Sequence, residues 1–146
     1  MGRYLLTGAA GFIGATVARL LLERGDSVVG VDNLNDAYDP RLKVWRLKQL
    51  RERSGFTFHA VDITDRDALG QAWGGAGFDG VLNLAARAGV RPSMRQPEIY
   101  FQTNLVGTLR LLELCRERGV PKLVLASTSS LYGANNPRPF REDADI

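Results

Sequence analysis

Short apolar runs alternate along the chain with longer segments in which apolar residues recur every three or four positions. The short runs predict buried strands, which cover residues 3–7, 27–31, 56–61, 80–84 and 122–126. The longer segments predict helices at residues 12–24, 41–53, 65–73 and 97–118. We expect Gly25 to end the first helix and Thr64 to cap the third. Strands that alternate with helices predict an α/β fold, a doubly wound parallel sheet in the strand order 3-2-1-4-5.

A glycine-rich turn follows the first predicted strand, with the sequence Thr7-Gly8-Ala9-Ala10-Gly11-Phe12-Ile13-Gly14. Gly8 permits a tight turn out of the strand, Gly11 lets a pyrophosphate approach the backbone, and Gly14 lets the next helix lie close to the sheet. Phosphates would rest on the helix N-terminus, where free N–H groups and the helix dipole favour an anion. Because this turn joins a strand to a helix, it predicts a dinucleotide-binding Rossmann fold.

Asp32 ends the second predicted strand, eighteen residues after Gly14. Its carboxylate is placed to accept hydrogen bonds from the adenosine ribose hydroxyls, and Asn33 follows in place of an arginine that would accommodate a 2′-phosphate. A carboxylate about 4 Å from a phosphate costs roughly 4 kcal/mol per charge pair at an effective dielectric constant near 20. These residues therefore predict NAD rather than NADP as the cofactor. The alternative is that Asp32 only caps a loop.

The composition is that of an ordinary globular chain, with 45% hydrophobic and 24% charged residues in 146. This length suits one domain, residues 1–146. No apolar run approaches the roughly 20 residues that span a bilayer, and the N-terminus lacks the pattern of a signal peptide. We therefore expect a cytoplasmic protein with no membrane partner.

The formal charge of +3 includes a concentration of cations on the predicted helix at residues 41–53. These cations are Arg41, Lys43, Arg46, Lys48, Arg51 and Arg53, and the other face of the helix carries Leu42, Trp45, Leu47 and Leu50. A solvent-exposed helix face is favoured over nucleic-acid binding, because no aromatic platform or recognition motif accompanies the cations.

The single cysteine and the single histidine predict no redox or metal chemistry. Cys115 cannot form an internal disulfide, and its place in an apolar helical segment predicts a small apolar helix residue. His59 lies in a predicted strand without a cluster of cysteines or carboxylates at ligand spacing, so we expect no metal site.

Five motifs occur in order along the chain: Thr7-Gly8-Ala9-Ala10-Gly11-Phe12-Ile13-Gly14, Asp62-Ile63-Thr64-Asp65, Asn83-Leu84-Ala85-Ala86, Asn104-Leu105-Val106-Gly107-Thr108 and Ser127-Thr128-Ser129-Ser130-Leu131-Tyr132-Gly133. Together they cover nearly the whole chain and resemble the extended short-chain dehydrogenase/reductases, the NAD-dependent sugar epimerase/dehydratase family. Within that family, residues 31–36, 38–40 and 88–91 are most similar to nucleotide-sugar 4-epimerases of the UDP-glucuronate type.

The resemblance implies a cofactor site residue by residue. The pyrophosphate would be held by Gly8, Gly11, Phe12, Ile13 and Gly14. The ribose would be held by Asp32 and Asn33, the adenine by Asp62 and Ile63, and the path to the nicotinamide would be lined by Leu84, Ala85 and Ala86.

Thr128, four residues before Tyr132, matches the family's catalytic Ser/Thr, whose hydroxyl would hydrogen-bond the sugar hydroxyl that is oxidised. The alternative is that a threonine after a strand satisfies backbone groups of its own loop. Family dehydratases carry an acidic pair just after this position, whereas this chain has Ser129 and Ser130. Without carboxylates for that proton transfer, the resemblance implies 4-epimerisation of a nucleotide sugar through a transient 4-keto sugar.

Two positions and one missing motif depart from the family pattern. Asn83 stands where many relatives have histidine, and Arg87 replaces a commonly neutral residue. The family's catalytic base is the tyrosine of a Tyr-x-x-x-Lys helix, and no tyrosine here has a lysine four residues on. We therefore expect the amino-terminal part of a longer enzyme, truncated before the last strands and without its substrate domain. The alternative is a non-catalytic dinucleotide-binding module or a truncated gene product.

The predicted helix at residues 97–118 carries an apolar stripe that is too wide for one sheet-facing side. Its members are Ile99, Leu105, Val106, Leu109, Leu111, Leu112 and Leu114. In the family that this chain resembles, the corresponding helix pairs with its copy across a two-fold axis. The sequence therefore predicts a homodimer.

Overall fold

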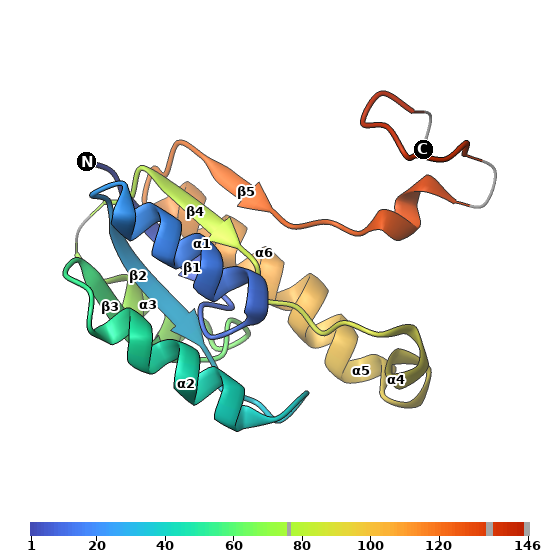
Figure 1. The fold of residues 1–146 in the computed structure, drawn as a ribbon, viewed down its shortest axis with the longest axis horizontal. Helices are drawn as coiled ribbons and strands as arrows, with labels where there is room; N and C mark the ends of the chain where they lie inside the picture. Colours follow the sequence, from blue (N-terminus) through green and yellow to red (C-terminus); the bar gives the residue numbers. More distant parts are fainter. Residues whose placement is uncertain (76, 134–135, 145–146) are drawn as a thin grey trace.

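Five parallel strands form one sheet in the order β3-β2-β1-β4-β5 in a computed structural model, which describes residues 1–75, 77–133 and 136–144 (Figure 1). The strands are β1 (Arg3–Thr7), β2 (Ser27–Asp32), β3 (Phe56–Ala60), β4 (Gly80–Asn83) and β5 (Leu123–Leu125). This order confirms the predicted doubly wound α/β fold. It also brings the carboxyl ends of all the strands to one edge of the sheet.

Helices cover both faces of this sheet (Figure 1). Their bounds are α1 (Phe12–Glu23), α2 (Pro40–Arg51), α3 (Arg66–Trp73), α4 (Val90–Arg95), α5 (Pro97–Tyr100), the π-helix η1 (Phe101–Val106), α6 (Gly107–Glu117) and the 3-10 helix η2 (Ser129–Tyr132). In the described part of the chain, no helix is long and apolar enough to cross a bilayer.

Each face of the sheet has its own apolar core, because successive strand residues point to opposite faces. Leu5 belongs to the cluster that Trp73 of α3 and Leu111 of α6 complete. Its neighbour Leu6 belongs to the cluster on the other face, with Ala18 of α1. Both leucines are fully buried. The alternation along β1 therefore fixes which helices lie on which face.

The predicted cap of α3 was wrong. Asp65, not Thr64, caps α3, because the Asp65 carboxylate accepts from the Ala68 N–H at 3.0 Å while the Thr64 hydroxyl donates to Asp62 at 2.7 Å. Residues 90–95, for which no element was predicted, form α4. The predicted helix at residues 97–118 is present as α5, η1 and α6 in succession, with a π-helical turn at η1. Gly25 does follow the end of α1, with φ of 87°.

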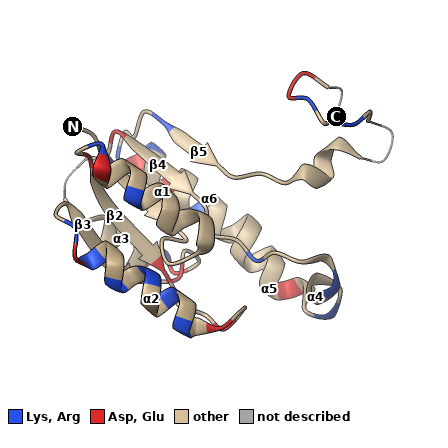
Figure 2. Cartoon of the chain, viewed as in Figure 1, with Lys and Arg blue, Asp and Glu red and all other residues tan. Residues whose placement is uncertain are grey.

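Lys and Arg residues recur along α2 (Figure 2). The expected apolar face of this helix was wrong at two of its four positions. Leu47 and Leu50 are buried, but Leu42 and Trp45 are 47% and 62% exposed. The inward-facing row is Lys43, Leu47 and Leu50, residues spaced four and three apart as helical geometry requires. Lys43 is therefore not part of the solvent-exposed basic face.

A buried polar network ties the ends of β1 and β4 to α6. The strand register pairs Thr7 with Asn83. The Thr7 hydroxyl donates to the Asn83 amide oxygen at 2.7 Å and accepts from the Leu84 and Ala85 N–H groups at 3.2 and 3.1 Å. The Asn83 amide nitrogen then donates to the Thr108 hydroxyl at 3.0 Å. Asn83, which departs from the family's histidine, thus holds the loop after β4 against α6.

We expect Thr7→Val to lower the free energy of unfolding by about 2 kcal/mol or more, because an isosteric methyl leaves buried polar groups unpaired at about 1–3 kcal/mol each. Urea unfolding followed by circular dichroism measures the change. The matched control is Thr57→Val at an exposed position of β3, which should change stability by no more than about 0.5 kcal/mol. Equal effects at both positions would contradict the structural role of Thr7.

Candidate functional site

A cavity of about 210 Å³ opens at the carboxyl edge of the sheet, between the turn after β1 and the loops after β2, β3 and β4. Nine of the residues predicted for cofactor binding line it: Gly8, Gly11, Asp32, Asn33, Asp62, Ile63, Leu84, Ala85 and Ala86. These residues come from four separate segments of the sequence. The parallel sheet brings them together because ligands of such sheets bind beyond the carboxyl ends of the strands.

The glycine turn has no room for side chains at its two ends. Gly8 has a positive φ of 68°, and a Cβ there would lie 2.8 Å from backbone atoms of Leu84 and Ala85. A Cβ on Gly14 would lie 2.0 Å from the Gly8 carbonyl oxygen, and one on Gly11 would lie 3.0 Å from the same oxygen. The turn therefore presents bare backbone to the cavity, as close approach of a phosphate requires.

Helix α1 begins at this turn without a capping side chain. Gly11 is its N-cap, no side chain hydrogen-bonds the cap, and the first turn carries no acidic residue. The first N–H groups of a helix have no intrahelical partner and favour an anion. The side chains of Phe12 and Ile13 are 76% and 61% exposed and do not line the cavity. Any contact of these two residues with a phosphate is therefore through their backbone N–H groups.

Asp32 is 7% exposed and is held in place by backbone donors. Its carboxylate accepts from the Ala10 N–H at 3.2 Å and from the Leu34 N–H at 2.8 Å. Leu34, which donates this second hydrogen bond, has a positive φ of 54° in the turn that follows β2. Asp32 therefore shapes the loop and lines the cavity at the same time, so its two proposed roles are compatible.

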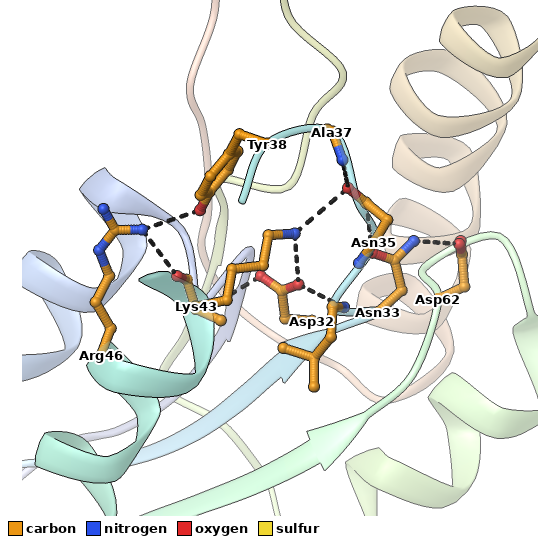
Figure 3. Close-up of polar contacts among 10 residues, drawn as sticks. Asp32, Asn33, Asn35, Ala37, Tyr38, Lys43, Arg46 and Asp62 are labelled. Atoms are coloured by element: carbon orange, nitrogen blue, oxygen red, sulfur yellow. Dashed lines mark hydrogen bonds and ion pairs between the residues drawn. The ribbon is translucent and has the colours of Figure 1, made fainter. Parts of the chain in front are cut away.

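Lys43 is a buried charged residue of the cavity lining that the sequence analysis did not place there (Figure 3). Its ammonium lies 3.4 Å from the Asp32 carboxylate and 3.4 Å from the Asn35 amide oxygen, and it lines the cavity. The signal was present in the sequence, because Lys43 shares its helical row with Leu47 and Leu50. A lysine in register with buried leucines indicates a buried charge that needs a partner.

Asp62 forms a second carboxylate at the cavity. Its oxygens accept from the Asn33 amide at 2.6 Å, from the Thr64 N–H at 2.9 Å and from the Thr64 hydroxyl at 2.7 Å. Burial acts to raise the pKa of Asp62, but these hydrogen bonds and the positive charge of Arg87 outweigh it, and the pKa is lowered. Asp62 is therefore an ionised acceptor, suited to a donor such as the exocyclic amine of adenine.

Thr128 lies away from the cavity. It is exposed, it caps η2, and its hydroxyl accepts from the Ser130 N–H at 3.2 Å. Figure 1 shows the segment after β5 extending away from the sheet. The hydrogen bond to Ser130 is the loop-satisfying arrangement that the sequence left open, and the catalytic assignment of Thr128 stays a prediction.

These features define a Rossmann-type dinucleotide-binding domain: a parallel sheet, a glycine turn without side chains, and the two carboxylates of Asp32 and Asp62 that line one cavity. A family model described as GDP-mannose 4,6 dehydratase matches residues 5–146. The chain belongs to this family of NAD-dependent epimerases and dehydratases, as the motifs predicted.

Two of the relatives with similar sequences are named as UDP-glucuronate 4-epimerases. The chain is 52% identical over 146 residues to a UDP-glucuronate 4-epimerase of Thermodesulfobacterium geofontis, covering all of this chain and 45% of that protein. It is 46% identical over 139 residues to UDP-glucuronate 4-epimerase 4 of Arabidopsis thaliana, covering 94% of this chain and 32% of that protein. The chain therefore spans less than half the length of these relatives.

Solved structures agree with the fold. A UDP-glucose-4-epimerase of Stenotrophomonas maltophila, crystallised with NAD and formylated UDP-arabinopyranose, superposes with a TM-score of 0.84 at 32% identity, covering 99% of this chain and 42% of that one. A UDP-glucuronic acid 4-epimerase of Bacillus cereus, in complex with UDP-glucuronic acid and NAD, superposes with a TM-score of 0.80 at 36% identity, covering 92% of this chain and 43% of that one. Both similarities extend across the candidate site.

Proposed function

We propose that this chain is the NAD-binding part of a nucleotide-sugar 4-epimerase, with a UDP-glucuronate-type sugar nucleotide as the substrate of the whole enzyme. The observation that carries the proposal is the bare glycine turn, which lines one cavity together with Asp32, the carboxylate that its Ala10 N–H holds. The names of the relatives support the substrate class. When bound, NAD supplies a reversible hydride acceptor for the sugar.

The residues around the cavity fit each part of NAD. The pyrophosphate would be held by Gly8, Gly11, Phe12, Ile13 and Gly14. The start of α1 offers it the N–H groups of Phe12, Ile13 and Gly14, whereas the Gly11 N–H already donates to the Gly8 carbonyl at 2.9 Å. Asp32 and Asn33 would hold the adenosine ribose, while Asp62 and Ile63 would hold the adenine. Leu84, Ala85 and Ala86 would line the path to the nicotinamide.

We favour an epimerase over a dehydratase because of the two residues that follow Thr128. Ser129 and Ser130 occupy the positions of the acidic pair that family dehydratases carry, and a serine hydroxyl does not replace a carboxylate in acid–base transfer at neutral pH. In this proposal the Thr128 hydroxyl hydrogen-bonds the sugar hydroxyl that loses its proton. That role requires the segment after β5 to lie nearer the cavity in the substrate-bound enzyme than in the present structure.

We expect the protein to bind NAD more tightly than NADP, and Asp32→Ala to weaken NAD binding about tenfold or more, because a hydrogen bond to a charged group is worth about 1.5–3 kcal/mol. Calorimetric titration with each dinucleotide gives the dissociation constants. Asp36→Ala is the control, since Asp36 is exposed in the same loop and does not line the cavity. Equal affinity for NAD and NADP, or an Asp32→Ala variant that binds NAD normally, would refute the ribose assignment.

Self-association as a homodimer is part of the same proposal. One face of the η1–α6 region exposes four large apolar side chains: Phe101, Leu105, Leu109 and Leu112, exposed by 55%, 57%, 50% and 47%. Leu111 and Leu114 of the same helix are buried against the sheet. An apolar face of this kind opposite a buried one favours association through a two-fold axis.

We expect a dimeric mass by light scattering at high micromolar concentration, and a shift toward monomer for Leu109→Glu, because a charge in the centre of an apolar interface opposes burial. Thr57→Glu on exposed β3 is the control that adds the same charge elsewhere. A monomeric mass for the unaltered chain, or no difference between the two variants, would contradict association through this face.

A further inference from the structure

The Lys43 ammonium is enclosed by polar and aromatic groups of the loop after β2. Its side chain is 5% exposed, and the Asp32 side chain opposite is 6% exposed. The ammonium lies 3.4 Å from Asp32 and from Asn35, and 5.2 Å from the ring centre of Tyr38 (Figure 3). A buried ammonium costs several kcal/mol unless it is paired. The Lys43 ammonium therefore needs hydrogen-bonding or charged partners, which an exposed lysine of α2 does not need.

The enclosure faces the candidate cofactor site. Lys43, Asp32, Asn35 and Tyr38 all line the same cavity, and Lys43 is the one cation among the described residues that do so. The neighbouring cation, Arg46, lies outside the lining. Its guanidinium donates to the Ala10 carbonyl at 3.4 Å and to the Tyr38 hydroxyl at 3.0 Å.

We propose that Lys43 is a specificity-determining residue at the ribose end of the dinucleotide site. In NAD binding, its ammonium donates a hydrogen bond to an adenosine ribose hydroxyl, and that hydroxyl in turn donates a hydrogen bond to the Asp32 carboxylate. When the charge of Asp32 is absent, the same ammonium binds the 2′-phosphate of NADP. This inference rests on the proposed dinucleotide function of the cavity.

The chemistry of a ribose hydroxyl supports this pairing. A hydroxyl is one donor and two acceptors, so a carboxylate alone leaves its acceptor side unused. The Lys43 ammonium has three N–H donors, two of which are used by Asp32 and Asn35. The third is available to an oxygen in the cavity.

The electrostatics of the pair set the cofactor preference. Asp32 is fixed by the Ala10 and Leu34 N–H groups, so its carboxylate stays at the ribose position whether or not Lys43 is present. A 2′-phosphate placed there meets both the negative charge of Asp32 and the positive charge of Lys43, and the two interactions oppose each other. Discrimination against NADP is therefore weaker than Asp32 alone would give. Removal of the Asp32 charge should raise the affinity for NADP relative to NAD, and removal of the Lys43 charge should lower it.

The test measures dissociation constants for NAD and NADP in the unaltered protein, Asp32→Asn, Lys43→Gln and the double variant. We expect Asp32→Asn to shift the NADP-to-NAD affinity ratio toward NADP by about tenfold or more, the effect of one hydrogen bond to a charged group. Lys43→Gln in that background should abolish the shift. Lys43→Gln alone should lower NADP affinity more than NAD affinity.

Lys48→Gln is the matched control, because Lys48 is exposed on α2 and does not line the cavity. It should leave both affinities unchanged. Thermal unfolding of each variant identifies those that fold, and the single Lys43→Gln comparison carries the test if Asp32→Asn does not fold.

A purely structural Lys43 would change both affinities by the same factor in every background, and that result overturns the inference. If the unaltered protein binds NAD but Lys43→Gln does not change the NADP-to-NAD affinity ratio, only the inference about Lys43 fails. If the unaltered protein binds neither dinucleotide, the proposed function fails, and the inference fails with it.

Discussion

The candidate site depends on the close approach of three backbone segments at one glycine turn. The Gly8 backbone lies directly against Leu84 and Ala85, and the first turn of α1 lies against the Gly8 carbonyl at Gly14. Any side chain at Gly8 or Gly14 would separate these segments. Because they are in contact, the N-terminus of α1 is held at the carboxyl edge of the sheet, and the cavity opens beside it.

Two carboxylates line the rest of the cavity beside the glycine turn. Asp32 is held by backbone donors and paired with Lys43, while Asp62 is held by Asn33 and Thr64. Each carboxylate therefore has a fixed position before any ligand enters, so little ordering of side chains opposes binding. The Thr7–Asn83–Thr108 network gives the loop after β4 the same rigidity.

Local apolar patterns were sufficient to predict the five strands and their order, and the glycine turn with Asp32 predicted the dinucleotide site. The lining residues Asp62, Ile63, Leu84, Ala85 and Ala86 came from the resemblance of their motifs to a known family, because their local sequence alone does not indicate a cofactor. The sequence did not predict α4, or that the turn at residues 101–106 of the predicted helix is π-helical, because the same apolar spacing fits both helix types. Thr64 and Asp65 are both good N-cap residues, and the choice between them was decided by Asp62, which engages the Thr64 hydroxyl.

Lys43 shows a different limit of sequence reasoning. A row of six cations along a helix favours a solvent-exposed face, and five of the six are at least partly exposed. The sixth, Lys43, lies in the buried row of Leu47 and Leu50, which the sequence does show. Its partners are Asp32 at the end of β2 and Asn35 in the loop that follows, and that contact depends on the tertiary fold. The position of Thr128 likewise depends on how the segment after β5 packs, which strand periodicity does not determine.

The central claim is that the cavity beside the glycine turn binds a dinucleotide. Backbone amide NMR spectra of the isotopically labelled protein, recorded as NAD is added, test it most directly. The account predicts that the largest shifts fall on Gly8, Gly11, Gly14, Asn33 and Ile63. Shifts confined to the groove between α1 and α2, at Arg19, Trp45 and Arg53, or spectra that do not change at millimolar NAD, would contradict it.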